Sequence, residues 1–227
     1  MKCPIIERKR QSDRSSSRST LRAESGHEEN TIEIAVLASG SGTNLQALID
    51  TPDIRAHLSV VISDEPEAGA LIRARSAGIQ TTVVRWADYP DRDRFSLAVA
   101  DAAEDSGAEG VVLAGFMRIL SPSFIDRFPN RILNIHPSLL PAFSGVHAVG
   151  SALEHGVGVT GVTVHFVDEK VDHGPIVAQR PVLVEPGDTE QSLHARIQVE
   201  EHELYPLVVA AFVNGNLEVN GRMVDWR

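Results

Sequence analysis

The sequence predicts an α/β fold in which a Rossmann-like parallel sheet in the N-terminal half continues into a mixed, partly antiparallel C-terminal half. Short apolar runs alternate with helical patterns from residue 31 to residue 136, and such alternation is typical of right-handed crossovers between parallel strands. Beyond that point two apolar runs follow each other with few residues between them, which favours antiparallel pairing. Near the C-terminus, Asn220-Gly221 predicts a hairpin turn.

The elements of the first half follow from apolar runs and glycine positions. A short apolar run at 32–37 suits a strand that is buried on both faces, and a helical pattern begins at Asn44 behind a glycine-rich turn. A second strand is expected at 58–62, and the helix at 68–77 ends before Gly78, a residue favoured in left-handed helix caps. These units form the parallel front of the expected sheet.

The same alternation continues toward the middle of the chain. Ser121-Pro122 predicts a short helix, because serine suits the cap and proline suits the first helical position. We expect a single catalytic domain over residues 31–227. Its remaining elements are expected as strands at 81–84, 111–114, 131–136, 162–167 and 176–184, helices at 91–105 and 189–213, and a hairpin at 217–224.

Charge is unevenly distributed along the 227 residues, whose formal net charge is −10. Residues 1–22 hold seven bases and two acids, so they carry +5 and the remainder carries −15. An acidic body argues against nonspecific nucleic-acid binding, although a local group of backbone N–H donors still binds phosphate. No apolar run approaches the roughly 20 residues of a membrane span. The expected partners are therefore small molecules, with neither nucleic acid nor membrane.

The first thirty residues are rich in serine and arginine and hold little to bury, so residues 1–30 are expected to be a disordered basic tail. A transit peptide is the alternative, while the apolar core of a secretory signal is missing. Cys3 is the single cysteine, which excludes an intrachain disulfide and a thiolate metal cage. The histidines show no metal-ligand spacing. We therefore expect no metal and a cytoplasmic location.

Between the first strand and the first helix lies a glycine-rich turn, Ser39-Gly40-Ser41-Gly42-Thr43-Asn44. Glycines there permit a tight turn and a close backbone approach, and the helix start presents N–H groups to an anion. A dinucleotide site is the competing interpretation, since Asp64 near the end of the second strand would suit a ribose. Leu45, however, occupies the third glycine position and obstructs the close helix–strand contact of that motif. Phosphate binding is favoured over both a dinucleotide site and a purely structural turn.

A polar pair, Asn134 and His136, stands at the end of a predicted strand, and its spacing of two places both side chains on one face. An asparagine amide suits a developing oxyanion, and a histidine can carry a proton. Asp172 lies in the turn 171–175, where a carboxylate beside His136 would orient the imidazole and favour its charged form. Ordinary strand-end and turn residues are the alternative. The combination predicts transfer of a one-carbon acyl group.

Five ordered segments of the chain read "LASGSGTNLQALID", "VVLAGFMRILS", "NIHPSLLPAFSG", "GVTVHFVDEKVDHGPIVAQ" and "EEHELYPLV". Together they resemble the phosphoribosylglycinamide formyltransferase family, at matching spacing from Ile32 to the C-terminus. The resemblance implies the formyltransferase fold. It also implies a step of de novo purine (IMP) biosynthesis, in which the formyl group of 10-formyltetrahydrofolate, a co-substrate, passes to the amine of N1-(5-phospho-D-ribosyl)glycinamide. A monomer or a homodimer would be expected.

The resemblance also implies a role for each site residue. Asn134 would stabilise the oxyanion, His136 would act as general acid and proton carrier, and Asp172 would hold and tune His136. Residues Gly42-Thr43-Asn44 would hold the ribose phosphate, and Glu201 would contact the glycinamide ribonucleotide. The folate-binding residues that it implies are Arg92, Met117, Arg118, Ile119, Leu120 and Asn134.

The chain departs from the family at Ala142, where a basic residue is common, so a substrate contact from that position is lost. Two related enzymes are less well matched. Methionyl-tRNA formyltransferase carries an additional C-terminal domain, and formyltetrahydrofolate deformylase carries an additional N-terminal domain. The alternatives from other classes are an NAD-dependent oxidoreductase of Rossmann type and an inactive binding module on the same fold.

Overall fold

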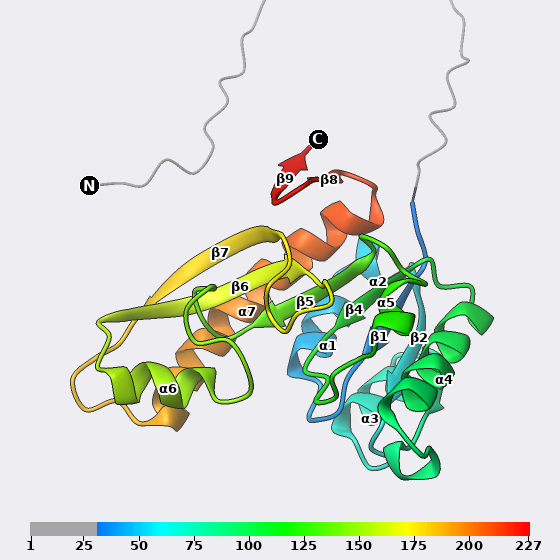
Figure 1. The fold of residues 1–227 in the computed structure, drawn as a ribbon, viewed down its shortest axis with the longest axis horizontal. Coiled ribbons are helices and arrows are strands. Elements are labelled where there is room, and N and C mark those ends of the chain that lie inside the picture. Colours follow the sequence, from blue (N-terminus) through cyan, green and yellow to red (C-terminus); the bar gives the residue numbers. More distant parts are fainter. Residues whose placement is uncertain (1–30) are drawn as a thin grey trace, which may run out of the picture.

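A computed structural model describes residues 31–227, and its centre is a seven-stranded sheet with the strand order β3-β2-β1-β4-β5-β6-β7 (Figure 1). Strands β1 to β5 are parallel to one another, whereas β6 is antiparallel to β5, and β7 is antiparallel to β6. The predicted parallel front and partly antiparallel back are therefore confirmed. The strands are β1 Ile34–Leu37, β2 Leu58–Ser63, β3 Thr81–Val83, β4 Gly110–Leu113, β5 Ile132–His136, β6 Val159–Phe166 and β7 Ile176–Leu183.

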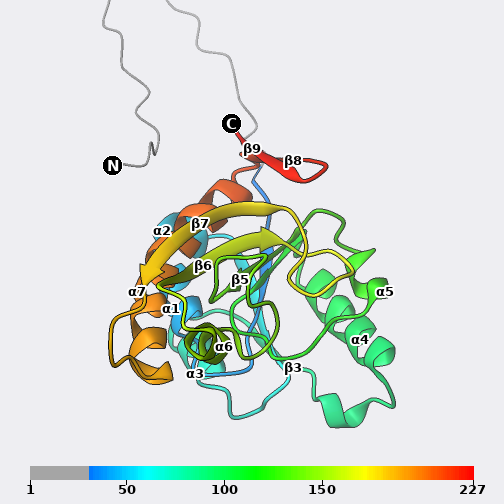
Figure 2. The same cartoon turned by 60° about the vertical axis from the view of Figure 1, so that its left-hand side comes forward.

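Helices cover both faces of this sheet. Figure 2 shows α1, α2 and α7 on one side and α4 and α5 on the other. Successive side chains of a strand point to opposite faces of the sheet. A strand of the parallel front therefore contributes side chains to two hydrophobic cores, one on each face. In β1, Ile34 and Val36 belong to the core under α1 and α7, while Ala35 and Leu37 belong to the core under α4. The helices are α1 Thr43–Ile49, α2 Pro52–Arg55, α3 Gly69–Ser76, α4 Arg92–Asp105, α5 Pro122–Ile125, α6 Ala148–His155 and α7 Glu190–Val213, with a 3-10 turn η1 at Trp86–Asp88.

Three short elements, α2, η1 and α6, are absent from the sequence prediction. The first two span a single turn each, which gives too few residues for a hydrophobic period to show. Helix α6 has eight residues, contains Gly150 and ends at Gly156, which has a φ of +67°. Glycine is unfavourable inside a helix, and a helix this short shows little hydrophobic periodicity. The sequence pattern therefore did not predict α6.

Helix α7 is the long element that ties the two halves together. It begins at Thr189, which forms a reciprocal capping box with Ser192. Near its middle, the buried Tyr205 hydroxyl donates a hydrogen bond to the carbonyl of Leu113 at 2.7 Å. Burial, with a smaller contribution from Glu201, raises the pKa of Tyr205 well above its ordinary value, so this phenol stays neutral. The bond holds α7 against the end of β4.

The chain ends in the hairpin β8 (Leu217–Asn220) and β9 (Met223–Trp226), whose turn lies at the predicted Asn220-Gly221. The hairpin is two residues longer than predicted. Over residues 31–227, every helix is too short or too polar to cross a membrane. The predicted tail at 1–30 lies outside the described residues.

Candidate active site

The glycine-rich turn joins β1 to α1 and contains a position that only glycine fills without strain. Gly42 has a φ of +74°, and a Cβ atom built there would lie 2.6 Å from the Cα of Ala70. Both conditions exclude an L side chain unless the backbone moves. The predicted tight turn is therefore present, and it brings the start of α1 close to α3.

Replacing Gly42 with alanine is expected to destabilise the fold by about 1–3 kcal/mol, because the methyl group meets backbone at a left-handed residue. The melting temperature should fall by roughly 3–8 °C, measured by calorimetry. Gly40→Ala is the matched control, since nothing lies within 4 Å of a Cβ atom at that position. Equal melting temperatures for the two variants would contradict this account.

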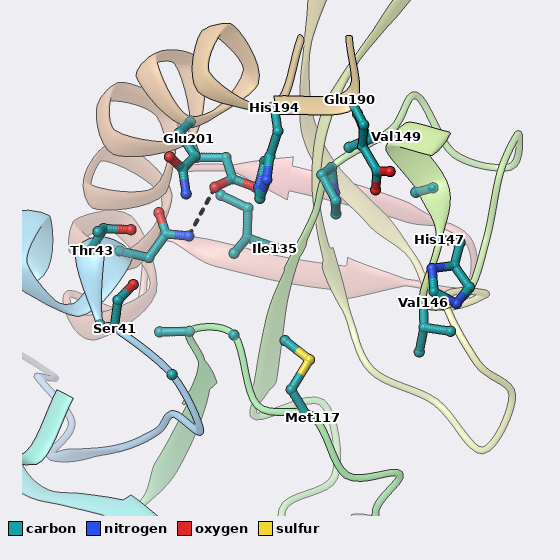
Figure 3. A pocket seen from close by; sticks show the side chains of 18 residues that line it. Ser41, Thr43, Met117, Ile135, Val146, His147, Val149, Glu190, His194 and Glu201 are labelled. Atoms are coloured by element: carbon teal, nitrogen blue, oxygen red, sulfur yellow. Dashed lines mark hydrogen bonds between the residues drawn. The ribbon is translucent and has the colours of Figure 1, made fainter. Parts of the chain in front are cut away.

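A cleft of about 300 Å³ opens at the carboxyl edge of the sheet. In an open α/β sheet this edge is where ligands bind. Its walls come from the glycine turn, from residues 114–117 after β4, from the end of β5, from the start of α6 and from one face of α7. Figure 3 shows Glu201 and Thr43 near each other at one end of the cleft, with Glu190 and His147 toward its other end.

Asn44 and Glu201, which are 157 positions apart in the sequence, meet in this cleft. The amide Nδ2 of Asn44 donates to Oε2 of Glu201 at 3.0 Å, and Glu201 is 5% exposed. The Oδ1 atom of Asn44 is buried and accepts no hydrogen bond from the described residues. Because a buried acceptor without a partner is costly, this atom is suited to a donor group of a ligand. The four residues predicted for phosphate and ribose are thus brought together.

The predicted catalytic residues also converge, and we call Asn134, His136 and Asp172 the Asn-His-Asp cluster. Asp172 lies in the turn between β6 and β7, where its φ is +50°. Its Oδ2 atom is 3.3 Å from Nδ1 of His136, and its Oδ1 atom is 3.5 Å from Nδ2 of Asn134. Sequence spacing predicted the two β5 residues on one face, and the structure adds the carboxylate to them.

The loop after β5 folds back over this cluster. The carbonyl of Phe143 lies 2.9 Å from Nε2 of His136, and the N–H of Gly145 donates to Oδ2 of Asp172 at 2.8 Å. A carbonyl only accepts, so Nε2 carries hydrogen, and the carboxylate faces Nδ1. Both contacts are favourable when both ring nitrogens of His136 carry hydrogen. The geometry therefore suits an imidazole that holds and releases a proton.

Burial of Asp172 would by itself raise its pKa. The contact with the imidazole of His165, the hydrogen bond from the N–H of Gly145, and the nearby charges of His136 and His165 outweigh this effect and lower the pKa below its ordinary value. Asp172 is therefore ionised at neutral pH. An ionised carboxylate at this position can stabilise positive charge on His136.

His165, on β6, is a site residue that the sequence did not reveal. It is 2% exposed, its Nε2 atom lies 3.1 Å from Nδ2 of Asn134 and 3.6 Å from Oδ1 of Asp172, and its Nδ1 atom lies 2.8 Å from the carbonyl of Phe166. The β5–β6 register places it opposite Asn134. Only that register would have found it, and the sequence alone does not provide the register.

The Asn-His-Asp cluster and the cleft lie on opposite sides of β5. Ile135 and Pro137 line the cleft, whereas Asn134 and His136 do not. Alternation along the strand turns their side chains toward the face that carries Ile132 and the core under α4. The edge of β5 therefore separates the polar cleft from the Asn-His-Asp cluster.

The predicted folate residues are only partly gathered. Met117 is 68% exposed and lines the cleft, and Ile119 is 57% exposed, while Leu120 is buried in the core under α4. The side chain of Arg118 is engaged by Asp64. Arg92 is exposed in the first turn of α4. This helix packs against α5, which follows the Met117–Leu120 segment.

The dinucleotide alternative fails at Asp64. Its side chain is 1% exposed, and both of its oxygens are engaged, by Ser39 at 2.5 Å and by Arg118 at 2.6 Å. It is therefore unavailable to a ribose. Leu45 is fully buried where that motif needs its third glycine. Within residues 31–227 no three His, Cys, Asp or Glu side chains gather around a metal position.

The fold is that of a formyl-group transferase, and residues 32–209 match the family model described as "Formyl transferase". The chain belongs to the formyl transferase family. Within that family its similarity is to the phosphoribosylglycinamide formyltransferases, which confirms the resemblance carried by the five segments.

Two curated relatives and one solved structure give the extent of this similarity. The phosphoribosylglycinamide formyltransferase of Escherichia coli (strain K12) is 42% identical over 192 residues, which cover 83% of this chain and 91% of the relative. That of Mycobacterium tuberculosis (strain ATCC 25618 / H37Rv) is 46% identical over 191 residues, covering 83% and 88%. Glycinamide ribonucleotide transformylase 1 from Symbiobacterium toebii superposes with a TM-score of 0.84 at 47% identity, covering 91% of this chain and 98% of that one.

Proposed function

We propose that the chain transfers the formyl group of 10-formyltetrahydrofolate to the amine of N1-(5-phospho-D-ribosyl)glycinamide. The products are the N2-formyl compound and tetrahydrofolate, in de novo purine (IMP) biosynthesis. The observation that carries the proposal is the Asn-His-Asp cluster, set beside a cleft that joins the glycine turn to Glu201. Family membership and relatives of the same name support it.

The cluster supplies what acyl transfer to an amine requires. Attack by the amine places negative charge on the formyl oxygen, and the amide Nδ2 of Asn134 is the donor suited to it. The contact of this nitrogen with Asp172, at 3.5 Å, is at the outer limit of a hydrogen bond, so a stronger acceptor would displace it. The C–N bond to the amine forms and the C–N bond to the folate breaks. His136 takes up the proton that the amine loses and delivers it to the departing folate nitrogen, while ionised Asp172 holds the imidazole.

Uncharged donors would bind the phosphate. Among the cleft-lining residues in the described part of the chain there is no lysine or arginine, and the charged or titratable ones are Glu190, Glu201, His147 and His194. Backbone N–H groups at Gly42-Thr43-Asn44 therefore carry phosphate binding. The carboxylate of Glu201 suits the hydroxyls or the amine of a glycinamide ribonucleotide, because it accepts hydrogen bonds only.

The folate site is assigned to residues beside the cleft. The exposed Met117 and Ile119 offer apolar surface for a flat ring, which is the chemistry that a folate needs. Arg118 and Leu120 hold this segment in place, Arg92 serves the charged end of the folate, and Asn134 borders the reacting carbon.

Residues 31–227 act as one catalytic domain in this proposal, because one sheet with a core on each face spans them. A single cysteine and a net charge of −10 support a cytoplasmic enzyme whose partners are small molecules rather than nucleic acid or membrane. It works as a monomer or a homodimer.

Acceptor dependence tests the proposed function. The folate difference spectrum should change with time only when the enzyme, 10-formyltetrahydrofolate and glycinamide ribonucleotide are all present. With water as the sole acceptor the spectrum should stay constant. Equal rates with and without the ribonucleotide would identify a deformylase, and tight binding of NADH in a fluorescence titration would revive the oxidoreductase alternative.

A further inference from the structure

The carboxylate of Asp64 lies between two loops that line the cleft. It directly follows β2, and its side chain is 1% exposed. Its Oδ1 atom accepts from the hydroxyl of Ser39 at 2.5 Å, and its Oδ2 atom accepts from Nε of Arg118 at 2.6 Å. Ser39 is the first residue of the glycine-rich turn, whereas Arg118 belongs to the Met117–Leu120 segment. One buried carboxylate therefore joins two walls of the cleft.

The hydroxyl of Ser39 extends this connection to the backbone. It accepts a hydrogen bond from the N–H of Met117 at 2.9 Å, and the N–H of Ser39 donates to the carbonyl of Gly115 at 3.0 Å. Gly40, the next residue along the chain, and Met117 both line the cleft. A polar network with every partner in place is rigid and costly to break. Movement of Ser39 would therefore shift both walls together.

Arg118 is held by the protein on three sides. Besides Asp64, its guanidinium contacts Glu65 at 3.2 Å and lies 5.4 Å from the centroid of the Trp86 ring. Trp86 packs against the fully buried Phe95 with centroids 5.0 Å apart. The side chain of Arg118 is therefore a structural anchor, and the exposed Met117 and Ile119 on either side of it are presented to the ligand.

We propose that Asp64 is a positioning residue that couples the two substrate subsites of this enzyme. The Ser39–Asp64–Arg118 network sets the glycine turn and the Met117–Leu120 segment relative to each other. A substrate that orders one of them therefore prepares the other, which is a coupling free energy between sites. Asp64 touches no reacting atom. The inference rests on the proposed function, because it assigns the two walls to the phosphoribosyl acceptor and to the formyl folate.

Steady-state kinetics of Asp64→Asn in the full chain tests this coupling. The amide keeps the shape but carries no charge, and its single oxygen can accept from Ser39 or from Arg118 but not from both. The KM for each substrate should rise about tenfold, with kcat within about twofold, because the anchor is weakened and the reacting residues are intact. Glu65→Gln is the matched control. This neighbour contacts the same guanidinium but is 53% exposed, and both KM values should stay unchanged.

Tryptophan fluorescence gives a readout that needs no turnover. The chain has two tryptophans, Trp86 and Trp226, so a Trp226→Phe background isolates the ring that Arg118 covers. Asp64→Asn should shift the emission of Trp86, and Glu65→Gln should not. If the wild-type chain failed to transfer a formyl group, the proposed function would fall, whereas the emission shift would still report on the network.

Unchanged KM values in Asp64→Asn, whether or not its melting temperature falls, would overturn the proposal, because a purely structural residue changes stability alone. An unchanged Trp86 emission would overturn it as well. Should Asp64→Asn fail to fold, Ser39→Ala takes its place, since Ser39 is only half-buried and the change removes two hydrogen bonds. The same rise in both KM values is expected, and its absence would refute the coupling.

Discussion

Replacing His136 with alanine is expected to lower kcat by about 100- to 10,000-fold and to leave the fold intact. The imidazole faces a carboxylate through Nδ1 and a carbonyl through Nε2, and within the Asn-His-Asp cluster it is the group that can carry a proton. The measurement is kcat from the folate difference spectrum at saturating substrates, with circular dichroism to verify folding.

His57→Ala serves as the control for this variant. His57 precedes β2, at the edge of the sheet opposite the cleft, and its ring lies 3.2 Å from Glu33. Its kcat should equal that of the wild type. Near-wild-type turnover in His136→Ala would refute the assignment of the proton carrier.

Asp172→Asn is expected to reduce kcat by a similar factor, about 100-fold or more. The side chain keeps its shape and still accepts from Gly145 through its remaining oxygen, but it loses the charge that stabilises a positive His136. The control is Asp168→Asn in the same turn, where an exposed carboxylate pairs with His173 at 2.6 Å. Comparable losses in both variants would contradict a specific role for Asp172.

The lowered pKa of Asp172 also predicts how stability depends on pH. A carboxyl group whose pKa is lower in the folded chain contributes stability above its unfolded pKa, about 4, and loses it as pH falls through the folded value. The wild type should therefore lose stability relative to Asp172→Asn below about pH 4. Melting temperatures across the acid range measure this difference.

The sequence predicted the parts of the fold that rest on periodic patterns. Buried strands such as β1 and β2 appear as apolar runs, and α7 was predicted as a long helix at 189–213, within one residue of its observed bounds. The two-residue spacing of Asn134 and His136 was sufficient to place them on one face. What it could not provide was pairing between distant segments, because register depends on the assembled sheet.

In the site, too, local features were predicted from the sequence and contacts between distant segments were not. Gly42 was predicted from local backbone requirements, and its φ of +74° agrees with them. The hydrogen bonds of Asn134 to His165 and of Asp64 to Arg118 cross 31 and 54 positions of sequence, and no local pattern predicts them. Asp64 was considered for a ribose because of its place after β2. In the structure both of its carboxylate oxygens accept hydrogen bonds from Ser39 and Arg118, so neither is available to a ribose. Such contacts between distant segments can be seen only in the tertiary structure.

Transfer of a labelled formyl group tests the central claim most directly. The enzyme would be given 10-formyltetrahydrofolate carrying ¹³C in the formyl group, together with glycinamide ribonucleotide, and the reaction would be followed by carbon NMR. The label should appear in an amide on the acceptor, one for each tetrahydrofolate formed, and far more slowly with His136→Ala. Appearance of the label as free formate, at a rate that does not depend on the acceptor or on His136, would contradict the account.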